Sequence, residues 1–225
     1  MKYYYCLLIG LIALISGSVY SQQLVRNKLL FAENAMLKNF DEGETINGSP
    51  YSSKDFIPAK IYPLDEIFNV RYNAYTDEME VKLEEEKVLV LDKTVTEYVI
   101  KVLNPDKTYV ILSIPEDNYG YFIFLKEFSN LTLYKKETKS FHEKKEAKSS
   151  YQQGSPAYYS DSEYKYFLKK NDSNELMEFS NNKSSLYKLF PNKKDKIKTY
   201  LKKNKVDLDT DAGIEKVVGF LNQSL

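Results

Sequence analysis

The chain has 225 residues, with 32 Lys and Arg balanced by 32 Asp and Glu, and it contains one histidine, one cysteine and no tryptophan. A single cysteine excludes an internal disulfide, and one cysteine with one histidine excludes the usual tetrahedral zinc site. The length suits one domain, with room for an appended helical region.

The beginning of the chain predicts a secretory signal peptide over residues 1–21. An apolar run extends from Cys6 to Gly17 after a single lysine. Val19 and Ser21 then precede Gln22 at the positions where a signal peptidase reads small residues. The run is shorter than the about 20 residues that span a bilayer. An exported protein of the periplasm or cell surface is therefore expected, and an uncleaved membrane anchor is the alternative.

Residues 24–40 predict an amphipathic helix. Apolar side chains recur there at spacings of three to five residues, close to the helical period, and Gly43 follows them. The segment Asn47–Ser53, rich in Gly, Pro and Ser, then predicts a loop.

From Ile57 onward, short segments rich in Tyr, Val, Ile and Phe alternate with turn residues, the pattern typical of strands. The connectors are too short for crossover helices, so neighbouring strands should be antiparallel. The sequence thus predicts a mainly β fold of the α+β type, an antiparallel meander forming a curved sheet or a partial barrel. The expected strands are Ile57–Tyr62, Ile67–Tyr75, Met79–Leu83, Val88–Leu91, Glu97–Leu103, Thr108–Ile114, Tyr119–Lys126, Thr132–Lys139, Tyr164–Lys170 and Asn174–Ser180.

Residues 142–163 are polar and predict a long excursion from the sheet. The end of the chain predicts short helices over 185–190, 193–204 and 211–225, with Asn182 or Ser184 capping the first and Asp209 and Asp211 at the start of the last. The expected organisation is a signal peptide over 1–21, a helix plus antiparallel β domain over 22–180, and a helical region over 181–225 packed on it.

The decapeptide RYNAYTDEME, residues 71–80, concentrates polar chemistry. Alternation places Tyr72 on an apolar face, and it places Arg71, Asn73 and Tyr75 on the opposite face. A hairpin with a turn at Thr76-Asp77 follows, in which Arg71 pairs with Glu78 or Glu80 across the strands. We interpret Arg71, Asn73 and Tyr75 as an exposed binding surface, and a catalytic carboxylate pair is the weaker alternative.

Two further motifs point to chemistry less strongly. His142 lies among lysines and glutamates, which is typical of a solvated loop histidine. Asp207, Asp209 and Asp211 resemble the start of a calcium loop, but Ala212 and Val218 stand where that loop needs Gly and Glu. No catalytic residue, metal ligand or cofactor is therefore predicted.

Charge is distributed unevenly along the chain. Residues 31–92 contain fourteen Asp/Glu against six Lys/Arg, and residues 133–205 contain eighteen Lys against nine Asp/Glu. The lysines are interspersed with apolar and acidic residues, which is typical of solvated faces, and a functional basic surface is the alternative. Export argues against a nucleic-acid partner. An envelope protein or a lipid is the expected partner, and peripheral contact with a membrane is compatible with the sequence.

Four separated motifs occur together: NGSPYSSKDFIPAKIY, VRYNAYTDEMEVK, GYFIFLKE with LTLYKKE, and LYKLFPNKKDKIKTYLKKNKVDL. In this order they resemble an uncharacterised family of exported proteins of Bacteroidetes and flavobacteria. The resemblance implies an envelope location and brings no functional residues with it. The expected function is a non-enzymatic binding or assembly protein. The alternatives are a carrier holding a lipid or other apolar ligand in the concavity of the sheet, and an envelope hydrolase.

Overall fold

The computed structural model describes residues 46–83, 87–115, 118–146, 154–173 and 175–223. Ten strands form one antiparallel sheet in the order β12-β11-β8-β7-β6-β5-β1-β2-β3-β4, which does not close into a barrel. The predicted mainly β fold with an open antiparallel sheet is thus confirmed. The sheet strands are β1 (Ile57–Tyr62), β2 (Glu66–Asn73), β3 (Glu78–Lys82), β4 (Val88–Val90), β5 (Val99–Val102), β6 (Lys107–Ile114), β7 (Asn118–Glu127), β8 (Leu131–Thr138), β11 (Glu163–Lys170) and β12 (Leu176–Phe179).

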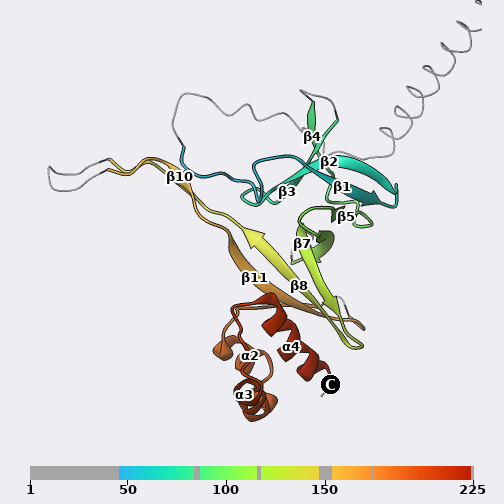
Figure 1. Ribbon diagram of the computed structural model, residues 1–225, viewed down its shortest axis with the longest axis vertical. Helices are drawn as coiled ribbons and strands as arrows, with labels where there is room; N and C mark the ends of the chain where they lie inside the picture. Colours follow the sequence, from blue (N-terminus) through green and yellow to red (C-terminus); the bar gives the residue numbers. More distant parts are fainter. Residues whose placement is uncertain (1–45, 84–86, 116–117, 147–153, 174, 224–225) are drawn as a thin grey trace, which may run out of the picture.

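The molecule has two parts joined by long strands (Figure 1). Strands β1 to β5 form the upper part, and β7, β8 and β11 run from it to three helices below. A second, two-stranded sheet pairs β9 (Phe141–His142) with β10 (Tyr158–Tyr159) and extends sideways as an arm. The predicted excursion over 142–163 therefore begins at the second residue of β9 and includes β10.

The strand order departs from a simple meander at one point. β5 pairs with β1 along Ala59–Tyr62, so β1 separates β5 from β2, and β4 ends at the opposite edge. The chain between β4 and β5 crosses from one strand to the other. Leu91 in this connection is buried, and its amide donates to the Met79 carbonyl of β3 at 2.8 Å. The expectation that consecutive strands are neighbours is wrong here, because this connection passes over the core instead of forming a hairpin.

Three apolar clusters stabilise the fold. The first core lies within the curl of β1, β2, β3, β5, β6 and β7, and its aromatic members are Tyr72, Tyr98, Tyr109 and Tyr121. The second core joins β8, β11 and β12 to the helices. The third cluster covers the other side of the sheet with Phe122, Tyr134 and Phe167. Strand β7 contributes buried side chains to the first core and to the third cluster, because its successive side chains point to opposite faces of the sheet.

The helices are α2 (Lys183–Leu189), the short 3-10 helix η1 (Pro191–Lys193), α3 (Lys194–Lys203) and α4 (Asp211–Asn222). Asn182 caps α2 by accepting from the Ser185 amide, as one of the two predicted caps. Thr210 caps α4 by accepting from Gly213, so the cap lies between the two predicted aspartates, and Asp211 occupies the first turn.

Two sequence predictions concern residues outside the described ranges: the signal peptide over 1–21 and the helix over 24–40. Among the helices that the structure does describe, none has the length and apolar character needed to cross a bilayer.

Candidate functional site

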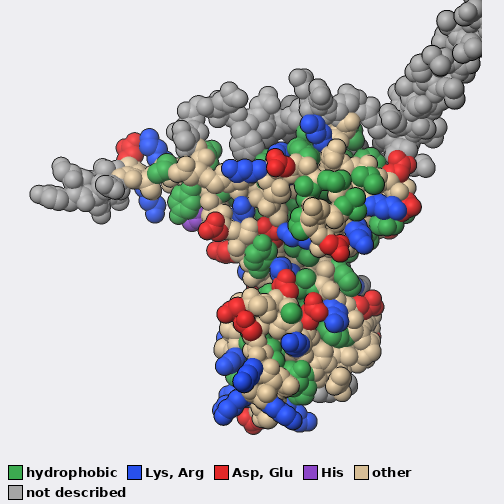
Figure 2. Space-filling model, in the orientation of Figure 1, with side chains coloured by type: hydrophobic (Ala, Val, Ile, Leu, Met, Phe, Trp, Pro, Cys, Tyr) green, Lys and Arg blue, Asp and Glu red, His purple; other side chains and the backbone are tan. Residues whose placement is uncertain are grey.

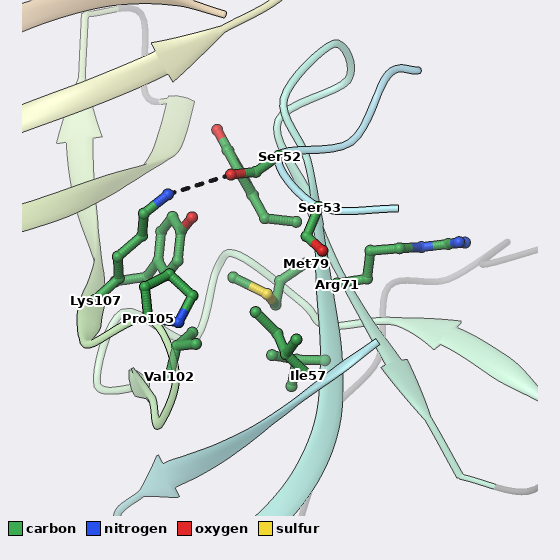
Figure 3. A pocket seen from close by; sticks show the side chains of 11 residues that line it. Ser52, Ser53, Ile57, Arg71, Met79, Val102, Pro105 and Lys107 are labelled. Atoms are coloured by element: carbon green, nitrogen blue, oxygen red, sulfur yellow. Dashed lines mark hydrogen bonds between the residues drawn. The ribbon is translucent and has the colours of Figure 1, made fainter. Parts of the chain in front are cut away.

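A small pocket of about 170 Å³ opens into the first core (Figure 3). Its lining combines apolar side chains with the polar ends of two serines and a lysine and with two tyrosines. The lining residues are Ser52, Ser53, Ile57, Val70, Arg71, Tyr72, Met79, Val102, Pro105, Lys107 and Tyr109. They come from the loop before β1 and from β1, β2, β3, β5, β6 and the turn between β5 and β6. The pocket therefore exists because the sheet curls around its own first core.

The polar side of the pocket is held by a buried carboxylate. Glu137 of β8 has a side chain that is 1% exposed, and it accepts hydrogen bonds from Ser52 at 2.8 Å and Ser162 at 2.7 Å. The Lys107 ammonium lies 3.6 Å from the same carboxylate and donates to the Ser52 hydroxyl at 3.3 Å. The hydrogen bond from Lys107 to Ser52 is drawn in Figure 3. A buried charge needs such partners, because leaving it unpaired costs several kcal/mol.

The Ser–Lys–Glu network joins segments that are far apart in the chain. Lys107 donates to the Ser52 hydroxyl, and that hydroxyl donates to the Glu137 carboxylate. The network therefore ties the loop before β1 to β6, β8 and the segment that precedes β11.

Two tyrosines complete the wall beside this network. Burial, followed by the charge of Glu137, raises the pKa of Tyr109, and a hydrogen bond with Ser52 offsets part of the rise. Burial, followed by the charge of Asp77, raises the pKa of Tyr72. Tyr72 donates to Asp77 at 2.8 Å and lies 5.1 Å from Tyr109 between ring centroids. Both hydroxyls therefore stay neutral, and burial of both rings with the Tyr72–Asp77 hydrogen bond holds this wall of the pocket in place.

The turn of the decapeptide anchors the other side of this wall. Asp77 has a positive φ of 56°, a conformation that aspartate tolerates better than most residues. Its carboxylate accepts from the Tyr121 amide at 3.2 Å and pairs with Lys136 at 3.0 Å and Lys93 at 3.5 Å. A Cβ at Gly120 would lie 2.8 Å from the Lys136 ammonium, so glycine leaves the space for this ion pair. The turn is thus bonded to β7 and β8.

The predicted surface of Arg71, Asn73 and Tyr75 divides into three environments. Arg71 pairs with Glu80 at 2.7 Å, as predicted, and donates to the Lys54 carbonyl at 3.2 Å. Its guanidinium stacks on Tyr51 at 3.6 Å. Its stem lines the pocket, and its charged end points away from Lys107 in Figure 3.

The other two predicted residues separate clearly. Asn73 is 5% exposed, and its side-chain oxygen accepts from the amides of Tyr75 and Thr76, so it shapes the turn instead of facing a partner. Tyr75 is 48% exposed and lies 5.4 Å from the Tyr159 ring of the arm. The assumption that all three are exposed is wrong. Alternation gives the face of the sheet on which a side chain lies, but it does not give the hydrogen bonds that hold the Asn73 side chain in the turn. Binding at Tyr75 stays a prediction.

The remaining candidate residues have structural contacts. His142 is exposed and stacks on Tyr158 at 4.5 Å in the arm. Asp211 pairs with Lys135 at 2.6 Å and accepts from Tyr166 at 2.7 Å. Within the described ranges, no group of three or more His, Cys, Asp or Glu side chains is arranged to hold a metal ion.

Sequence reasoning missed Ser52, Lys107 and Glu137. Ser52 and Glu137 are 85 residues apart, so no local spacing reveals their contact. One weak signal existed: the strand that contains Glu137 begins with mostly apolar residues and then has three charged residues in a row, Lys135, Lys136 and Glu137. Comparison of the chain with protein-family models, with curated proteins and with solved structures found no match.

Proposed function

We propose that the protein is a non-enzymatic binding or assembly protein of the cell envelope, whose pocket receives one side chain of a partner protein. The supporting observation is the pocket itself, which combines the apolar side chains of Ile57, Met79 and Val102 with polar side chains. A cavity of about 150 Å³ lined by apolar side chains holds a benzene-sized group. The pocket is of this size and adds hydrogen-bonding groups, which suits the ring and hydroxyl of a tyrosine.

The size of the pocket favours this proposal over the lipid carrier. Ligand sites for whole small molecules enclose about 300–1,000 Å³, and this pocket has about 170 Å³. The rest of the first core is filled by buried side chains, among them Tyr121 at 1% exposure. One anchoring side chain fits without rearrangement, whereas a lipid would have to displace part of the core.

Native mass spectrometry of the protein isolated from its own envelope tests the class of ligand. The proposal predicts a protein partner in the isolated complex. A lipid retained at a one-to-one ratio would favour the carrier instead and would overturn the proposal.

A matched pair of variants tests the pocket. The Ser53 side chain lines the pocket, and its hydroxyl accepts from the Asp55 amide at 3.3 Å. Ser173, in the turn between β11 and β12, accepts from the Glu175 amide at the same distance of 3.3 Å and is outside the pocket. We expect Ser53→Phe to fill the pocket and reduce partner recovery about tenfold or more, the worth of burying one large side chain. Ser173→Phe should leave recovery unchanged. Equal recovery with both variants would contradict the proposal.

A further inference from the structure

The segment that forms α2, η1 and α3 is strongly basic. Between Lys183 and Lys205 the chain has nine lysines and a single acid, Asp195. Eight of the nine lysines are exposed, and Lys193 is partly buried. The apolar residues of α3 point inward, with Ile197 completely buried and Leu201 4% exposed. We call the surface formed by the eight exposed lysines the basic face. They are Lys183, Lys188, Lys194, Lys196, Lys198, Lys202, Lys203 and Lys205.

The basic face has eight lysines against one acid within it, Asp195, and the acids of the neighbouring elements have other partners. On α4, Asp211 pairs with Lys135 of β8 and Glu215 pairs with Lys126 of β7 at 3.4 Å, so both acids face the sheet. In the loop between α3 and α4, Asp209 accepts from Asn181, and Asp207 accepts from the Asp209 amide. The ion pairs found within the described residues involve none of the eight lysines.

The basic face covers the end of the molecule farthest from the pocket. Figure 2 shows blue side chains projecting around the bottom of the helical region, where Figure 1 places α3. A broad hollow of about 650 Å³ adjoins them, and its charged lining residues are Lys196, Lys203 and Asp195. Its floor includes Tyr200 and Phe220, whose rings stack at 4.2 Å. Lysine charges beside partly exposed aromatic rings are the combination found at membrane–water interfaces.

We propose that the basic face binds the surface of a bilayer that contains anionic phospholipids. The lysines project from the end of the molecule, which lets many of them approach a flat charged surface together. Binding is electrostatic and peripheral, because the buried residues of α3, Ile197 and Leu201, remain in the second core. This site is separate from the pocket and does not depend on the function proposed for it.

Vesicle co-sedimentation of the protein as isolated from its cell tests this proposal. We expect it to bind vesicles that mix phosphatidylglycerol with phosphatidylcholine, and to dissociate as salt rises and screens the charges. Each lysine near such a surface contributes about fivefold in affinity. The quadruple variant Lys196→Gln, Lys198→Gln, Lys202→Gln and Lys203→Gln should therefore bind roughly 600-fold more weakly.

A second quadruple variant controls for net charge. Lys54, Lys87, Lys101 and Lys144 are exposed residues outside the helical region, and replacing all four by Gln changes the net charge equally. This variant should bind within about twofold of the unchanged protein. An equal loss in both variants would overturn the proposal, as would equal binding to phosphatidylcholine alone. Tighter binding to single-stranded DNA than to anionic vesicles would also overturn it and assign the face to another polyanion. Circular dichroism would confirm that both variants are folded.

Discussion

The two ends of the molecule use charge in opposite ways. Around the first core, ionised groups lie inside the structure: Glu137 has a side chain that is 1% exposed, and the Asp77–Lys136 pair is 21% and 15% exposed. The second core, between the sheet and the helices, is made almost entirely of apolar side chains, and the lysines of the helical region lie outside.

This difference separates two kinds of structural role. A buried network of charges and hydrogen bonds specifies one geometry, because each member must keep its partners. Such a network suits a pocket with a fixed shape. An apolar core stabilises the helices without specifying their surface, which leaves that surface available for lysines. The first core thus supports shape recognition, and the helical region supports recognition of charge.

The largest expected effect on stability belongs to the apolar second core. Leu221 of α4 is completely buried, so Leu221→Ala should lower the free energy of unfolding by about 2–5 kcal/mol. Leu103 is 45% exposed, and Leu103→Ala should cost less than about 1 kcal/mol. Urea denaturation measures both values. Similar values for the two variants would contradict the assignment of Leu221 to the core.

The Asp77 turn should rank next. Asp77→Ala leaves Lys136 without its carboxylate and places alanine at a positive φ, so it should cost about 3 kcal/mol. Asp77→Asn tolerates the backbone conformation and keeps an acceptor for Tyr72, so it should cost roughly half as much. If both variants unfold at the same urea concentration as the unchanged protein, the turn does not stabilise the first core.

Alkaline pH should lower the free energy of unfolding through the buried tyrosines of the first core. Burial raises the pKa of Tyr121 above its ordinary value of 10.0. The folded protein therefore holds this proton where the unfolded chain releases it, so the stabilisation is complete below pH 10 and declines above it. Tyr121→Phe should reduce the loss of stability above pH 10 by about 1.4 kcal/mol per pH unit. Parallel decline in both proteins, measured by urea denaturation at several pH values, would contradict this account.

Arg71 should give the smallest of these effects. Arg71→Lys keeps the positive charge but removes the planar group that stacks on Tyr51 and donates twice to Glu80. We expect a loss of about 1 kcal/mol in the free energy of unfolding. Burial, assisted by the Glu80 carboxylate, raises the pKa of Tyr51 to about 12. An unchanged stability would show that the stacked arginine contributes no more than any surface cation.

Local patterns predicted the elements better than the site. Alternation and turn residues located the strands, including Ile57–Tyr62 with its observed bounds, because side chains that alternate across a sheet leave a local signal. The pairing of β1 with β5 could not be predicted, because it depends on how the sheet curls around its core. The same holds for Glu137, whose partners Ser52 and Ser162 become neighbours only after folding. Asn73 was predicted to face outward, but its side-chain oxygen accepts from the backbone of the turn. Asp77 lies in the turn as predicted, and its carboxylate also accepts from the Tyr121 amide of β7, which no local pattern indicates.

The most direct test of the account is methyl-resolved NMR with p-cresol, the side-chain analogue of tyrosine. We predict saturable shifts at Ile57, Met79 and Val102 around the pocket, none at Val217 of the second core, and loss of the shifts in Ser53→Phe but not in Ser173→Phe. Unmoved pocket methyls at saturating p-cresol, or shifts of equal size at Val217, would contradict the claim that the first core provides a fixed recognition pocket.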